Sequence, residues 1–217
     1  MRLEKFREIR LEDEEVLGKV LEQQARIIGS CKICKGTGFL RSRICECMVK
    51  YKTIMNVVIS GAPLEALDVF DIISDRRRLD DPECFRVIMS INKHDIKEVN
   101  RTKFLYSDIV NPYLKHFPTN AFVDGDSLVM FGSNSCGKTW SLYYILSNLA
   151  SKYSVYFILL KDLLNIINNS MYSSNEDERN KNRKTLRLLK NVDMLLIDEG
   201  SKLALTDNTS VQIEAFV

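Results

Sequence analysis

The sequence lacks any apolar run approaching the roughly 18 residues that a membrane-spanning helix requires. Its first ten residues are charged throughout and contain no apolar segment of the kind found in a secretory signal. It also lacks a strong net charge, because 31 Lys and Arg against 29 Asp and Glu leave +2 at pH 7. These absences argue against a membrane or secreted protein, and overall charge does not demand a nucleic-acid partner. They predict a cytoplasmic protein.

The composition is that of a folded protein. Of the 217 residues, 45% are hydrophobic and 28% are charged, which is ordinary for a globular chain. The length suits one domain with a smaller accessory piece. Four of the six cysteines lie between Cys31 and Cys47. In a reducing compartment, clustered cysteines are more often metal ligands than disulfides.

Three regions differ in pattern, namely residues 1–52, 53–100 and 101–217. The first contains a predicted helix followed by the cysteine cluster, and the second is a mixed connector without repeats. Residues 1 to about 30 are expected to be helical, and within them Glu12 to Ile28 has apolar residues near helical spacing at Val16, Val20, Leu21 and Ile27 or Ile28. It can pack on its own domain or dock on a partner, and the pattern does not decide between these.

Residues 101–217 alternate between helix and strand patterns. We expect helices at 104–116, 138–150, 161–168 and 183–190, and strands at 127–131, 154–159 and 194–197, with a polar loop at 170–182. Such alternation is typical of an α/β fold, a parallel sheet with flanking crossover helices.

A phosphate-binding motif, G-x-x-x-x-G-K-[ST], lies between the first of these strands and the helix that follows. Its residues are Gly132, Ser133, Asn134, Ser135, Cys136, Gly137, Lys138 and Thr139. Backbone N–H groups of the loop and the helix N-terminus can hold phosphates there. Lys138 is expected to reach the β- and γ-phosphates, and the Thr139 hydroxyl to bind Mg²⁺. The motif predicts a P-loop NTPase with ATP and Mg²⁺ as cofactors, in which Cys136 is a small tolerated residue.

Two carboxylates, Asp198 and Glu199, end the apolar run 194–197 about sixty residues after the loop. In a P-loop fold such an Asp supports Mg²⁺, and the Glu can act as general base toward the attacking water. A solvated acidic turn would have the same sequence, but the spacing from the loop favours the catalytic interpretation. The Asp-Glu pair, with no Ser-Gly-Gly signature upstream, favours the AAA+ class over small kinases, GTPases and transporter ATPases.

The cysteine pattern Cys31-x2-Cys34 followed by Cys45-x-Cys47 can surround a tetrahedral Zn²⁺. Four thiolates close the coordination sphere, so the zinc is expected to be structural and to fold a segment too small to fold alone. A redox pair or unrelated free cysteines are the alternatives. The basic residues around the site either balance thiolate charge or contact nucleic acid or an acidic partner.

Together these segments resemble the DnaC/IstB-type AAA+ family of bacterial and phage replicative-helicase loaders and related transposition ATPases. The resemblance is carried by the cysteine motif with its Lys-Gly-Thr-Gly, and by residues 128–139, 160–164 and 190–199. Most of it lies in residues 101–217, and the first 30 residues are not diagnostic.

The resemblance implies an AAA+ ATPase that self-associates through this domain and grips a hexameric replicative DNA helicase with its N-terminal part. Such a protein helps to place single-stranded DNA inside the helicase. Lys138 and Thr139 would then bind nucleotide and metal, Asp198 would support Mg²⁺, and Glu199 would activate water. The segment from Ser170 to Arg183 would be a DNA-facing loop, unless it is merely solvated; its cations are Arg179, Lys181, Arg183 and Lys184.

The sequence departs from the family after the acidic pair. The family's domain continues with strands that carry a sensor residue and an arginine finger, whereas this sequence has 18 residues after Glu199. We therefore expect a fragment of a longer protein, in which nucleotide binding survives and hydrolysis is slow. Two other functions stay open: a transposition regulator that assembles on duplex DNA, and a zinc-bearing adaptor that binds nucleotide without hydrolysis. The cysteines favour a loader over the regulator, and the absent elements would favour the adaptor if the chain ended naturally at this point.

Overall fold

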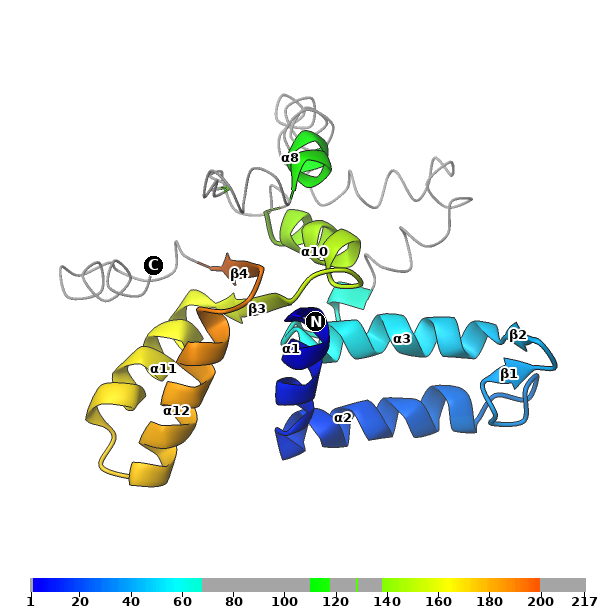
Figure 1. The fold of residues 1–217 in the computed structure, drawn as a ribbon, viewed down its shortest axis with the longest axis horizontal. Helices are drawn as coiled ribbons and strands as arrows, with labels where there is room; N and C mark the ends of the chain where they lie inside the picture. The colour runs from blue at the N-terminus through cyan, green and yellow to red at the C-terminus, as the bar shows by residue number, and fades with distance from the viewer. Residues whose placement is uncertain (1, 68–109, 118–127, 129–137, 200–217) are drawn as a thin grey trace. The chain divides into compact units, whose positions relative to one another are not determined.

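The computed structural model describes residues 2–67, 110–117, 128 and 138–199 (Figure 1). These residues fall into two compact units, each considered by itself below. The first contains residues 2–64 with 149–199, and the second contains 65–67, 110–117, 128 and 138–148. Within the described ranges, no helix has both the length and the apolar character needed to cross a membrane.

The N-terminal segment is helical, as predicted, but it is broken by a corner. Helix α1 (Arg2–Leu11) ends there, and helix α2 (Glu14–Gln24) begins after Asp13, whose carboxylate accepts the N–H of Glu15 as an N-cap. A π-helical turn η1 (Ala25–Gly29) extends α2 toward the first cysteine. Val16 and Val20 are buried as expected, whereas Leu21 is exposed.

A second helix runs back beside α2 and forms a hairpin with it (Figure 1). This helix, α3 (Glu46–Ile59), buries Ile54, Val57 and Val58. Two short antiparallel strands, β1 (Phe39–Leu40) and β2 (Arg43–Ile44), connect η1 to α3 at the end of the hairpin. Helix α3 therefore continues without a break across residues 52 and 53, where the sequence pattern had separated the cysteine module from the connector.

A small parallel sheet forms the other part of the first unit. Strand β3 (Val155–Leu159) pairs with strand β4 (Met194–Asp198) in a register that places Val155 opposite Met194 and Leu159 opposite Asp198. Helices α11 (Leu160–Tyr172) and α12 (Glu176–Leu189) make the crossover that parallel strands require. Both predicted strands and the parallel pairing are confirmed. The predicted strand 127–131 lies outside the described residues apart from Leu128, so the larger P-loop sheet stays a prediction.

The predicted loop at residues 170–182 is wrong, because most of that segment is helical. Helix α11 continues to Tyr172, and α12 starts at Glu176 after only three residues. The Asn175 side chain caps α12 by accepting the N–H groups of Asp177 and Glu178. Three acidic residues in the first turn add favourable charge at the positive end of the helix. The polar composition that indicated a loop is instead that of a largely solvent-exposed helix.

The helical hairpin packs against the sheet through backbone and arginine contacts. The Phe157 N–H of β3 donates to the Ser60 carbonyl at 2.7 Å, which occupies part of the outer edge of the strand. The Arg10 guanidinium donates to the Ile59 carbonyl at 2.8 Å and lies 4.9 Å from the ring centre of Tyr156. Gly61, at φ 76°, faces β3 so closely that a Cβ would lie 3.0 Å from the Phe157 oxygen.

The second unit contains helix α8 (Asn111–His116) and all but the last residue of helix α10 (Lys138–Leu149). Helix α8 corresponds to the end of the helix predicted at 104–116, and the earlier part of that prediction lies outside the described residues. Helix α10 confirms the helix predicted after the phosphate-binding loop and ends within one residue of the expected position. It buries Leu142, Ile145 and Leu146.

Candidate functional site

The four predicted zinc ligands meet at the end of the helical hairpin. The Sγ atoms of Cys31, Cys34, Cys45 and Cys47 all lie within 4.8 Å of one another. Cys31 Sγ is 3.9 Å from Cys45 Sγ, and Cys34 Sγ is 3.5 Å from Cys47 Sγ. These separations are much longer than a disulfide bond of ~2.05 Å. All four cysteines are therefore free thiols in the structure. Because their sulfurs lie so close together, the prediction that the four residues converge on one point is confirmed.

Local backbone geometry brings the four sulfurs together from three elements. Cys31 follows η1, Cys45 is the N-cap of α3, and Cys47 lies in the first turn of that helix. After Cys34 the chain turns sharply through residues with positive φ, ending at Gly38 (76°). Gly38 donates its N–H to Cys34 Sγ at 3.2 Å and accepts the Cys45 N–H on its carbonyl oxygen at 3.0 Å. One glycine thus connects both halves of the ligand set.

The thiols influence one another's ionisation. Burial opposes ionisation of Cys34, but the Gly38 N–H and the other three thiols donate to its sulfur and lower its pKa from 9.0 to about 6. Burial, together with the hydrogen bond to Cys34, raises the pKa of Cys47 above its ordinary value. Cys34 is therefore the thiolate that these contacts favour, and a thiolate is the form that binds metal.

The donor set fits a single zinc ion. Zn–S bonds of ~2.3 Å in a tetrahedron place neighbouring sulfurs ~3.8 Å apart, close to the two pairs found here. The Gly38 N–H supplies the kind of outer contact that orients and stabilises a thiolate ligand. Four cysteines would fill the coordination sphere, so the chemistry of this site is that of a structural metal.

The end of the hairpin exposes more apolar surface than the cysteine pattern indicates. Exposed hydrophobic side chains surround the cluster, and Ile33 is the most exposed of them at 67%. The others are Phe39, Leu40, Ile44 and Val49. Exposed Lys and Arg side chains lie in the same segment, at positions 32, 35, 41, 43, 50 and 52. The cations are evident in the sequence, whereas the exposed apolar residues could not be recognised there, because two-residue strands such as β1 and β2 give no pattern that distinguishes them from loops.

The predicted nucleotide-binding residues are described only in part. Gly132, Ser133, Asn134, Ser135, Cys136 and Gly137 lie outside the described residues. Lys138 and Thr139 are the first two residues of α10, and both are half-buried. The positive end of a twelve-residue helix therefore begins where the motif requires it.

The two predicted carboxylates lie at the carboxyl end of β4. Asp198 is the last residue of the strand, and its Oδ1 accepts the N–H of Glu199 at 2.8 Å. Glu199 has φ 61°, a left-handed conformation that is uncommon for a residue with a side chain. Such backbone strain clusters at functional sites, and here it occurs at the candidate general base. Lys138 belongs to one compact unit and Asp198 to the other, so their joint site stays a prediction.

The start of β4 is fixed by a buried carboxylate that the sequence analysis did not single out. Asp193 Oδ2 accepts the N–H of Ser154 at 2.9 Å and its hydroxyl at 2.7 Å. Asp193 Oδ1 accepts from Arg2 Nη1 of α1 at 2.9 Å. This carboxylate therefore holds β3 and β4 in register five residues before Asp198.

Two arginines from the predicted DNA-facing segment have partners within the fold. Arg183 Nε donates to the Ser170 carbonyl at 3.1 Å, and Arg179 Nη1 donates to the Ser173 carbonyl at 3.0 Å. Carbonyls at the end of α11 have no partner within their own helix, and cations are favourable there. The structure therefore gives these two cations a helix-capping role.

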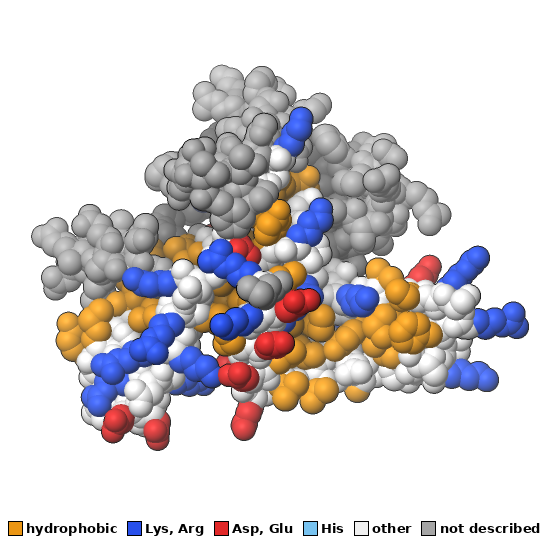
Figure 2. Space-filling model, in the orientation of Figure 1, with side chains coloured by type: hydrophobic (Ala, Val, Ile, Leu, Met, Phe, Trp, Pro, Cys, Tyr) orange, Lys and Arg blue, Asp and Glu red, His pale blue; other side chains and the backbone are white. Residues whose placement is uncertain are grey.

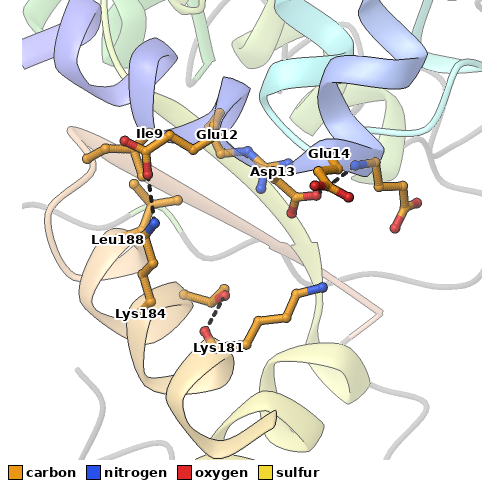
Figure 3. A pocket seen from close by; sticks show the side chains of 10 residues that line it. Ile9, Glu12, Asp13, Glu14, Lys181, Lys184 and Leu188 are labelled. Carbon is orange, nitrogen blue, oxygen red and sulfur yellow. Dashed lines mark hydrogen bonds and ion pairs between the residues drawn. The ribbon is translucent and has the colours of Figure 1, made fainter. Parts of the chain in front are cut away.

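Two lysines of α12 face an acidic corner of the same unit across an open cleft of about 550 Å³ (Figure 3). Lys184 Nζ lies 2.7 Å from Glu12 Oε2, and Lys181 lines the same cleft. The facing acidic residues come from the turn between α1 and α2 and from the first turn of α2, and are Glu12, Asp13, Glu14 and Glu15. The cleft is thus a charged contact between the N-terminal helices and α12.

Comparison of the chain with protein-family models, with curated proteins and with solved structures found no match. Functional assignment therefore depends on the residues themselves.

Proposed function

We propose that this protein is an ATP-dependent loader of a hexameric replicative DNA helicase, with a P-loop nucleotide site and a zinc-stabilised helical hairpin. The observation that carries the proposal is the combination of two features in one chain. One is the four-cysteine cluster, and the other is a P-loop motif followed by a strand that ends in Asp198 and Glu199.

In the proposed nucleotide site, the loop from Gly132 to Gly137 and the first turn of α10 hold the phosphates of ATP. Lys138 contacts the β- and γ-phosphates, and Thr139 binds Mg²⁺ with support from Asp198. Glu199 orients and polarises the attacking water. The positions of Lys138 and Thr139 at a helix N-terminus and of Asp198 at a strand end support these roles.

Zinc in the proposed metal centre is structural. Bound by the four cysteines, it would hold β1, β2 and the first turn of α3 in one arrangement, because so short a segment has too little core to fold alone. Removing the metal is then expected to disorder the end of the hairpin.

Single-stranded DNA is the proposed nucleic-acid partner of the loaded helicase complex. The capping roles of Arg179 and Arg183 leave the remaining cations of α12, rather than a flexible loop, as its contact surface in this chain. A DNA-binding role for α12 predicts that Arg187→Ala weakens single-stranded DNA binding more at low salt than at high salt, because phosphate contacts are screened.

The test is a binding and turnover experiment with the full chain and the hexameric helicase of the same replicon. Wild type, Lys138→Ala and Glu199→Gln are compared for ATP·Mg²⁺ binding, helicase capture and ATPase rate, with and without single-stranded DNA. A loader predicts helicase capture that depends on nucleotide state. It also predicts lost nucleotide binding in Lys138→Ala, and retained binding with slower turnover in Glu199→Gln.

Other outcomes identify the alternatives. Nucleotide binding with no turnover under any condition, and helicase capture unaffected by Lys138→Ala, would favour a non-hydrolysing adaptor. Absence of helicase capture in every nucleotide state, with nucleotide-dependent assembly on duplex DNA, would favour a transposition regulator.

A further inference from the structure

Two exposed apolar surfaces lie on the helical hairpin. The tip surface is formed by Ile33, Phe39, Leu40, Ile44 and Val49. Phe39 and Ile44 are directly opposed in the β1–β2 pair, so their side chains share one face, and each is about half exposed. In Figure 2 hydrophobic side chains gather along the hairpin on the face toward the viewer, and Lys and Arg side chains project from its far end.

The second surface is the outer face of α2, formed by Leu17, Gly18 and Leu21. Leu17 and Leu21 are four residues apart, so they lie on the same side of the helix, and both are exposed. Gly18 has no atom within 4 Å of the position where a Cβ would be. Glycine is unfavourable inside a helix, and nothing in the described part of this chain requires it at this position. Close approach of another backbone is a physical reason for a glycine on an exposed apolar helix face.

The two surfaces carry opposite charge. Residues 31–52 contain six exposed Lys and Arg residues and one acidic residue, Glu46. Helix α2 exposes Glu14, Glu15 and Glu22 against one cation, Lys19, which pairs with Glu15 at 2.7 Å. A basic apolar surface and an acidic apolar surface on one hairpin are therefore complementary to each other.

We propose that the tip surface of one copy docks on the outer face of α2 in a second copy, so that two hairpins pair antiparallel around a two-fold axis. In such a pair the contact between tip surface and α2 face is made twice, so both surfaces of each copy are covered by the same second copy. A nucleic acid fits less well, because the α2 face is acidic and the tip surface is mainly aliphatic, with Phe39 as its one aromatic ring. The inference goes beyond helicase loading and does not rest on it.

The substitution Gly18→Gln distinguishes the proposed pairing of two hairpins from an α2 face that binds no second copy. Gln is a better helix former than Gly, so the substitution is expected to raise the melting temperature of the chain. In the antiparallel pair its side chain would hold the two backbones apart, and the dimer dissociation constant should rise at least ~10-fold. Asn180→Gln, on the exposed side of α12, is the matched control, with improved helix propensity and unchanged dimerisation. Zinc-loaded full chain is measured by sedimentation equilibrium and thermal melting.

A charge-reversal experiment tests which surfaces meet. Arg41→Glu with Arg43→Glu reverses charge on the tip surface, and Glu22→Lys with Gln24→Lys, two exposed positions of α2 outside the α12 cleft, reverses it on α2. Each double variant alone is expected to be monomeric, because like charges face each other in both contacts. An equimolar mixture should dimerise again, since both contacts then pair opposite charges. Recovery is expected to weaken with added salt.

Three results would overturn the inference. The first is a zinc-loaded wild type that stays monomeric up to ~100 μM, a concentration at which weak but specific dimers form. The second is a dimer unaffected by Gly18→Gln and by both charge reversals, which would locate self-association elsewhere. The third is a monomer whose helicase binding is lost in Gly18→Gln, which would assign the α2 face to that partner instead.

Discussion

The hydrogen bonds that the buried Asp193 carboxylate accepts from Ser154 are expected to contribute far more to the free energy of unfolding than its ion pair with Arg2 of α1. Its side chain is only 6% exposed and accepts both the Ser154 N–H and the Ser154 hydroxyl. Hydrogen bonds to a charged group contribute about 1.5–3 kcal/mol each, and a buried N–H left without a partner costs about 1–3 kcal/mol. Asp193→Ala should therefore lower the free energy of unfolding by about 3 kcal/mol.

Arg2→Ala is the matched variant for comparison, because Arg2 is a largely exposed residue that contacts the same Asp193 carboxylate. Its side chain is 58% exposed, and exposed ion pairs contribute about 0–1 kcal/mol. Arg2→Ala should therefore cost less than about 1 kcal/mol. Asp193→Asn retains an acceptor for Ser154 and should fall between the two alanine variants.

Urea unfolding of the full, zinc-loaded chain, followed by far-ultraviolet circular dichroism, measures all three variants. The free energy of unfolding of a domain of this kind is about 5–15 kcal/mol, so a loss of about 3 kcal/mol gives a clear shift of the urea midpoint. Equal losses for Arg2→Ala and Asp193→Ala would refute the reasoning, because the contact with α1 would then dominate. A loss below about 1 kcal/mol for Asp193→Ala would show that Ser154 finds other partners.

Further predictions concern the metal centre and the α11–α12 connection. Purified reduced protein should contain close to one Zn²⁺ per chain, and metal analysis giving less than about half would contradict a four-thiolate site. Gly38→Ala should cost about 1–2 kcal/mol and weaken zinc binding in a chelator competition, because φ 76° is unfavourable for alanine. Asn175→Ala should cost about 1 kcal/mol by removing the α12 cap, whereas Ser174→Ala should change the urea midpoint little.

The elements that the sequence predicted correctly are those with strong local patterns. The apolar runs of β3 and β4 are bounded by polar residues, and a strand buried on both faces shows such a run without alternation. The four cysteines are closely spaced, so their convergence needs only a short turn. Helix α12 was predicted too short because its first half is almost entirely polar. The Asn175 cap and acidic first turn are local signals that could have located its start.

The attachment of the N-terminal helices to the sheet could not be predicted, because it depends on single contacts between distant residues. In the sequence, Arg7 and Arg10 are two more cations in a charged segment, with nothing to separate them from solvated side chains. In the structure, Arg7 donates to Asn56 and to the Ala150 carbonyl, and Arg10 donates to the Ile59 carbonyl. Because α1 contacts both α3 of the hairpin and the segment that leads into β3, a displacement of α1 would act on the hairpin and on that strand. The contacts of α1 therefore join the hairpin to the sheet whose strand β4 ends at Asp198.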